Sequence, residues 1–94
     1  MIRHIVMWKF RAEETARKRQ FLDGLAALDG VIPEIRRMEV REDAAGGSNY
    51  DAVLVADFDT LEALKTYKED PRHRAVAAIC KEIRTDRAAV DFEL

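Results

Sequence analysis

The side chains best suited to proton transfer lie at two places in this sequence, His4 near its start and the segment that contains Tyr67 and His73. An imidazole exchanges protons near neutral pH, and a phenol can hold the oxygen of a developing enolate. Pro71 predicts the start of a helix, because its fixed φ and missing N–H suit the first helical position. His73 then lies in the first turn, where the positive end of the helix dipole disfavours an imidazolium and predicts a neutral ring at pH 7.

The face of that helix indicates what surrounds His73. Helical spacing places Val76, Ala77 and Cys80 on the same side, so the imidazole is expected at the mouth of an apolar interior. If the break before this helix folds the flanking segments together, Tyr67 reaches the same place. The pair then fits a general base with an oxyanion partner. It fits better a first-turn histidine bonded to the backbone beside a packed phenol.

Residues 2–10 alternate as a β-strand, which places His4 on one face with Val6 and Trp8. A lone histidine on an apolar face fits a hydrogen-bonded core residue, and a role as a reagent depends on its approach to His73. The sequence has no His-x-x-His or Glu-x-x-His spacing, so we expect no metal site. It has no Gly-x-Gly-x-x-Gly or P-loop motif, so we expect no nucleotide cofactor.

The other elements follow from hydrophobic periodicity and from turn residues. Asp59 with Glu62 resembles a capping box for a short helix, and Asp70 is expected to cap the helix that begins at Pro71. In order, we expect strand 2–10, helix 13–28, strand 35–42 near a sheet edge, strand 50–58, a short helix through Leu61 and Tyr67, a helix from Pro71 through Ile83, and strand 88–94.

Composition narrows the class of protein. Ninety-four residues are expected to form one domain, 1–94, with a thin core. Sixteen basic and eighteen acidic residues are interspersed, so the chain lacks the clustered cationic surface of a nucleic-acid-binding protein. Its apolar runs are far shorter than the ~20 residues of a membrane span, and no signal peptide is evident. A single cysteine suits a reducing compartment, and we expect a cytoplasmic protein.

The order β-α-β-β-α(α)-β predicts an α+β, ferredoxin-like fold with a four-stranded antiparallel sheet. Helices can cover only one face of such a sheet. Ile5, Met7, Val53 and Val55 would point from the uncovered face, and together they form an apolar patch too large for a monomer to expose. We therefore expect a twofold homodimer that buries this face.

Five segments in the correct order resemble the stress-responsive A/B barrel (Dabb) family, within the dimeric α+β barrel superfamily. The resemblance extends over essentially the whole chain. Its signatures are the opening Ile2–Phe10, the turn Ile32-Pro33-Glu34-Ile35, the strand Tyr50–Phe58, the segment from Tyr67 to His73, and the closing Val90-Asp91-Phe92.

The resemblance implies a dimer whose two sheets form a barrel, with a ligand cavity in each subunit between sheet and helices. Some plant members are cofactor-free cyclases that fold a polyketide by aldol condensation. Their tyrosine and histidine correspond to Tyr67 and His73 here, and a first-strand histidine corresponds to His4. Two positions depart from the pattern: Asp70 stands where the family often has histidine, and the first helix offers Leu25 or Ala26 in place of an aromatic hydroxyl.

Three hypotheses about function follow. The first is binding of a small apolar, aromatic or acyl molecule. The second is a cofactor-free enzyme, cyclase-like or monooxygenase-like, with His73 as base and with Tyr67 and His4 as further catalytic candidates. The third is a structural, stress-related protein that acts by self-assembly. For the first, the expected ligand contacts are His4, Val6, Trp8, Leu54, Phe58, Tyr67 and His73.

Overall fold

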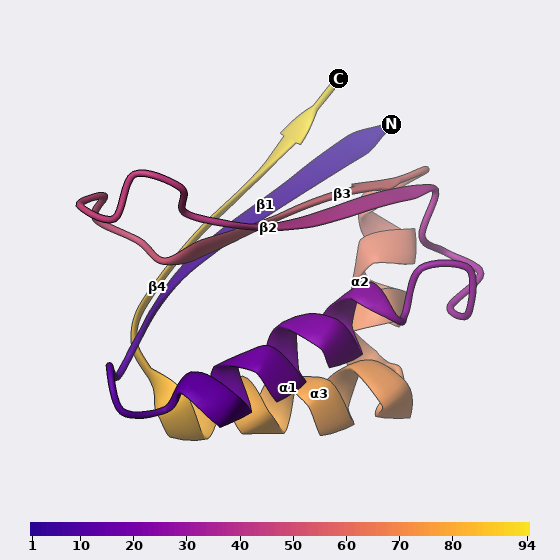
Figure 1. The fold of residues 1–94 in the computed structure, drawn as a ribbon. Helices are drawn as coiled ribbons and strands as arrows, with labels where there is room; N and C mark the ends of the chain where they lie inside the picture. Colours follow the sequence, from indigo (N-terminus) through magenta and orange to yellow (C-terminus); the bar gives the residue numbers. More distant parts are fainter.

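The computed structural model describes residues 1–94 and has the expected order of elements. The four strands form one antiparallel sheet in the order β2-β3-β1-β4, which is the ferredoxin-like arrangement. Three helices pack on one face of this sheet (Figure 1). The elements are β1 (Ile2–Phe10), α1 (Thr15–Ala26), β2 (Arg37–Glu42), β3 (Ala52–Phe58), α2 (Leu61–Glu69), α3 (Pro71–Ile83) and β4 (Arg84–Glu93).

The register of β1 decides which side chains meet on each face. His4 lies opposite Asp91 of β4, and Trp8 lies opposite Arg87. Residues directly opposite each other in an antiparallel pair project to the same side of the sheet. Asp91 and Arg87 therefore stand beside His4 and Trp8 on the face that the helices cover.

The core lies between that face and the helices. Eighteen apolar residues are buried in one cluster, and the largest fully enclosed side chains include Tyr67, Phe58 and Leu22. On β1, and on β3 as far as Ala56, buried residues alternate with more exposed ones, as expected for a sheet with one covered face. None of the three helices combines the length and apolar character needed to cross a bilayer.

The opposite face of the sheet carries no helix (Figure 1). Ile5 and Val55 lie opposite each other on this face and are only half-buried. Val90 and Phe92 of β4 continue the same surface, and they remain 55% and 41% exposed. The chain thus presents an apolar surface that spans three strands.

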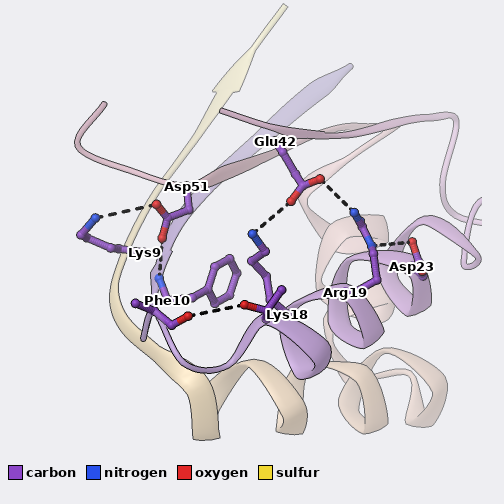
Figure 2. Close-up of polar contacts among 9 residues, drawn as sticks. Lys9, Phe10, Lys18, Arg19, Asp23, Glu42 and Asp51 are labelled. Atoms are coloured by element: carbon purple, nitrogen blue, oxygen red, sulfur yellow. Dashed lines mark hydrogen bonds and ion pairs between the residues drawn. The ribbon is translucent and has the colours of Figure 1, made fainter. Parts of the chain in front are cut away.

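Polar contacts close the side of the molecule where α1 approaches β2 (Figure 2). Glu42 accepts contacts from Lys18 Nζ at 3.2 Å and from Arg19 Nη1 at 2.8 Å. Nearby, Asp51 accepts a hydrogen bond from the backbone N–H of Phe10 at 2.8 Å. The two Glu42 contacts fix the first helix against the edge strand, and the Asp51 contact fixes the end of β1.

The predicted ends of several elements were wrong by a few residues. The helix expected at 13–28 runs from Thr15 to Ala26, because the chain then continues in tighter i→i+3 bonds, from Leu28 N–H to the Leu25 carbonyl at 3.1 Å and from Asp29 N–H to the Ala26 carbonyl at 3.3 Å. The strand expected at 35–42 begins at Arg37, because the N–H of Ile35 bonds to the Ile32 carbonyl at 3.2 Å. The strand expected at 50–58 begins at Ala52.

The largest difference is in the last strand. It was expected at 88–94, and it begins at Arg84, directly after the last residue of α3. Its first four residues are polar and lie at the edge of the sheet, so they carry no apolar alternation that would have indicated a strand.

One of the two predicted helix caps was also wrong. Thr60, rather than Asp59, caps α2 by accepting a hydrogen bond from the N–H of Ala63 at 3.0 Å. The carboxylate of Asp59 is engaged by the Arg36 guanidinium instead. The cap of α3 is as expected, because Asp70 accepts from the N–H of Arg72 at 2.8 Å.

Candidate functional site

A cavity of about 580 Å³ lies under the β1–β4 half of the sheet, against α3. Its apolar wall comes from strands and helices that also build the core: Val6, Trp8, Phe21, Leu54, Ala77 and Cys80. Its polar wall consists entirely of histidine, lysine and arginine: His4, His73, Lys68, Arg74, Lys81, Arg84 and Arg87. The cavity therefore combines a buried apolar surface with a basic rim.

His4 enters this wall from β1 and is 3% exposed. Its Nδ1 lies 2.5 Å from Oδ1 of Asp91, and a carboxylate accepts, so Nδ1 carries the proton. Burial lowers the pKa of the ring and outweighs the opposite effect of Asp91. The neutral tautomer then leaves Nε2 with a free lone pair.

His73 enters the same wall from α3, where Asp70 and Pro71 fix the start of the helix and make it the third residue. Its Nδ1 lies 3.1 Å from the carbonyl oxygen of Lys68, which can only accept, so this ring also carries its proton on Nδ1. Removal from water lowers its pKa, and a charge on His4 would lower it further. The ring is thus a neutral imidazole with Nε2 free to accept a proton.

The neutral state of His73 was expected from the helix dipole, but the main cause differs. The strongest influence on its pKa is burial of the ring against its neighbours. Its ring centroid lies 4.4 Å from that of Tyr67. The aromatic contact and the backbone hydrogen bond together hold the imidazole in place.

Tyr67 lies behind the cavity wall. It is fully buried, it packs against Phe58 at 5.0 Å between ring centroids, and its hydroxyl has no hydrogen-bond partner. Burial raises the pKa of the phenol, so the group stays protonated at neutral pH. Tyr67 therefore packs behind His73 and does not line the cavity.

The structure thus divides the residues expected to contact a ligand. His4, Val6, Trp8, Leu54 and His73 line the cavity together. Phe58 and Tyr67 are buried in the core beside it and are absent from its lining.

Sequence reasoning missed two parts of the site. Asp91 bonds to His4 and lies 4.0 Å from Lys68 Nζ, and antiparallel pairing of the first and last strands could have placed it there. The basic rim was visible as a stripe at helical spacing around Ala77, at Arg74, Lys81 and Arg84.

Cys80 lines the cavity, and burial raises the pKa of its thiol, so it contributes a small apolar surface rather than a thiolate. No group of three or more His, Cys, Asp or Glu side chains is arranged to hold a metal ion. The groups available for chemistry in the cavity are therefore two neutral imidazoles and several lysine and arginine cations.

Comparisons with known proteins agree with this fold. The sequence matches the family model of the Stress responsive A/B Barrel Domain (Dabb) over residues 2–94. An uncharacterized protein of Streptomyces coelicolor, SCO4036, is 30% identical over 89 residues, which cover 90% of this chain and 92% of that protein.

Two crystal structures are similar over nearly the whole chain. A dimeric ferredoxin-like protein of unknown function from Bacteroides fragilis is 31% identical, with a TM-score of 0.85, and the match covers 99% of this chain and 95% of that one. A dimeric ferredoxin-like protein from Thermobifida fusca, also of unknown function, is 33% identical, with a TM-score of 0.87 and coverage of 99% and 90%. This chain therefore belongs to the stress-responsive A/B barrel (Dabb) domain family.

Proposed function

We propose that this protein binds a small molecule with an aromatic or acyl body in the cavity between sheet and helices. The observation that carries the proposal is the cavity itself, because its volume of about 580 Å³ falls in the range typical of ligand sites. Trp8, Leu54 and Val6 offer an apolar floor for such a body.

The two histidines give the ligand an orientation. Each uses Nδ1 on a protein acceptor and leaves Nε2 unpaired beside the cavity. Two fixed acceptors above an apolar floor favour a ligand with a hydroxyl or N–H group at its edge. Such a small number of placed polar groups is characteristic of specific small-molecule sites.

Filling the cavity tests the binding proposal. Ala77→Trp places an indole in the space, whereas Ala78→Trp places the same side chain on the exposed face of α3, outside the lining. We expect titration calorimetry to show binding of naphthalene-2-carboxamide or naphthalene-2-carboxylate to the wild type and to Ala78→Trp, and none to Ala77→Trp. Native mass spectrometry of the purified protein adds a search for a molecule that co-purifies.

The result that would contradict this proposal is equally specific. If neither naphthalene compound binds, or if both bind Ala77→Trp as well as the wild type, the cavity is not a binding site for aromatic bodies.

We further propose that two copies associate through the uncovered face of the sheet, around Ile5, Met7, Val53 and Val55. Support comes from the exposed apolar surface and from a hollow of about 420 Å³ beside Met7 and Val53 on the same face. The relatives from Bacteroides fragilis and Thermobifida fusca are described as dimeric.

Analytical ultracentrifugation of Val53→Asp tests this interface. A carboxylate placed in the layer between the two sheets must leave water, which costs several kcal/mol even with Arg41 opposite it, so we expect this variant to sediment as a monomer. Lys65→Asp, on α2 and away from the sheet face, serves as the control and should remain a dimer. A Val53→Asp dimer would show that this face is not the interface.

A second candidate function is proton transfer with His73 as general base, as in a cofactor-free cyclase- or monooxygenase-like reaction. The observation that favours it is the free Nε2 of a neutral imidazole at the cavity wall. In such a step Nε2 takes a proton from a carbon next to a carbonyl, which leaves an enolate and an imidazolium.

Hydrogen exchange of a bound ketone measures this step without knowledge of the natural substrate. We expect the methyl protons of 2-acetylnaphthalene to exchange in D₂O faster with the protein than in buffer. A general base typically contributes about 10²–10⁴-fold, and His73→Gln should remove that gain. If His73→Gln binds the ketone and exchanges it at the wild-type rate, the histidine is not a base.

A further inference from the structure

The cations of this protein are unevenly paired. Eleven of the sixteen lysines and arginines make an ion pair with a carboxylate. The five that make none are Lys65, Arg74, Lys81, Arg84 and Arg87. Four of these five line the cavity, and Lys65 is the exception. In a chain with a formal net charge of −2, a shortage of acidic groups does not explain this distribution.

The unpaired cations lie around one cavity, on two adjoining elements. Arg74 and Lys81 lie seven residues apart on α3, Arg84 follows as the first residue of β4, and Arg87 stands on β4 opposite Trp8. Like charges gathered at one surface repel each other. An arrangement with this cost is expected where an anion supplies the missing charge.

The nearest acidic group does not fulfil that role. No aspartate or glutamate is among the thirteen lining residues. Asp91 lies behind His4, to which it is hydrogen-bonded at 2.5 Å, and its other oxygen is 4.0 Å from Lys68. Asp91 therefore interacts with His4 and Lys68, and the other cations of the cavity rim have no carboxylate partner.

We propose that the ligand of this cavity is an amphipathic anion. Its aromatic or acyl body lies on the apolar floor, and its carboxylate or phosphate lies at the mouth between the cations of β4 (Arg84 and Arg87) and those of α3 (Arg74 and Lys81). This inference rests on the binding function proposed above and adds the charge of the ligand. Arginine suits both head groups, because its planar guanidinium can donate two parallel hydrogen bonds to either.

Matched probes of one shape test the charge. Naphthalene-2-carboxylate and naphthalene-2-carboxamide differ chiefly in charge, and 2-naphthyl phosphate replaces one anionic head group with the other. We expect calorimetry at low salt to show the carboxylate binding about tenfold more tightly than the amide, with a smaller ratio at about 0.3 M salt, since exposed charges are screened. The tighter of the two anions identifies the head group.

Charge-removing variants locate the anion. Arg87→Gln and Arg74→Gln should each weaken binding of the carboxylate by about three- to tenfold and leave binding of the amide unchanged. Lys65→Gln removes the unpaired cation outside the cavity, so it is the matched control and should bind both probes like the wild type.

The outcomes separate this inference from the function on which it rests. If the amide binds as tightly as both anions, or if Lys65→Gln weakens carboxylate binding as much as Arg87→Gln does, the inference is wrong while the cavity remains a binding site. If Arg87→Gln impairs self-association in ultracentrifugation and leaves carboxylate affinity unchanged, the rim cations meet carboxylates of a second copy, which also overturns it. If no probe binds in a way that Ala77→Trp abolishes, the proposed function itself fails.

Discussion

The cations at the two edges of the sheet differ in whether they have carboxylate partners. At the β2 edge, Glu42 is held between Lys18 and Arg19, so the first helix is closed onto the strand (Figure 2). At the β4 edge, Arg84 and Arg87 face a cavity and have no carboxylate partner. The same chain therefore neutralises its cations at one edge and leaves them unpaired at the other.

Side-chain packing against the sheet also differs between these two edges. Leu22 and Leu25 of α1 are 1% and 2% exposed and lie outside the cavity lining, so the helix seals that half of the sheet. Toward β4 the core instead ends at Trp8 of β1 and Leu54 of β3, which border open space. One half of the covered face is closed, and the other half leaves an open cavity.

We expect the largest effect from the same truncation, leucine to alanine, made once in the closed half of the covered face and once beside the cavity. Leu22→Ala should lower the free energy of unfolding by about 2–5 kcal/mol, because it leaves a void in a closed core. Leu54→Ala should cost less, since the lost atoms border a space that already exists. Urea denaturation measures both, and an equal or larger loss for Leu54→Ala would contradict the contrast between the halves.

Tyr67→Phe should raise the free energy of unfolding by about 1 kcal/mol. The phenol hydroxyl is buried without a hydrogen-bond partner, and removal of such a group relieves its desolvation cost. Thermal denaturation measures the change. A clear loss of stability would mean that the hydroxyl has a partner in solution, such as a buried water molecule.

Glu42→Gln should lower the free energy of unfolding by less than about 1 kcal/mol. The variant loses two ion pairs, but the Glu42 side chain is 41% exposed, so solvent screens them. The loss should shrink further at high salt, where exposed charges interact weakly. A larger loss that does not depend on salt would show that the ion pairs of Glu42 with Lys18 and Arg19 are more than surface contacts.

We expect the smallest effect from a new carboxylate at the β4 edge, which would correspond to Glu42 at the β2 edge. Ala89 lies between Arg87 and Asp91 on the same face of β4 and is exposed. Ala89→Glu should change the free energy of unfolding by less than about 0.5 kcal/mol relative to Ala89→Gln, since Arg87 attracts the new carboxylate and Asp91 repels it. It should nevertheless bind naphthalene-2-carboxylate less well than Ala89→Gln does. Equal binding by the two variants would show that the rim cations need no counter-charge.

Sequence patterns predicted the fold well where apolar residues alternate or recur at helical spacing. The alternation of Ile2–Phe10 identified β1, and Asp70 with Pro71 located the start of α3. The start of β4 could not be predicted, because its first residues face a cavity mouth and an open edge rather than a core.

The site was predictable only in part, for a related reason. His4 and His73 could be identified by residue type and by helix or strand position. Whether Tyr67 opens onto the cavity or lies behind His73 depends on how α2 meets α3, and no local pattern reports that angle. The absence of partners around the rim cations is likewise a property of the whole fold, since a sequence shows only that acidic residues exist.

The junction between α3 and β4 has a mechanical consequence. Helix and strand follow each other without a linker, and the carbonyl of Ile83 accepts a hydrogen bond from the N–H of Arg11 at 3.0 Å. This hydrogen bond holds the C-terminal end of α3, at one side of the cavity mouth, against the segment that follows β1. We therefore expect a ligand that displaces α3 to move the end near Asp70, where the chain breaks between two helices, further than the end at Ile83.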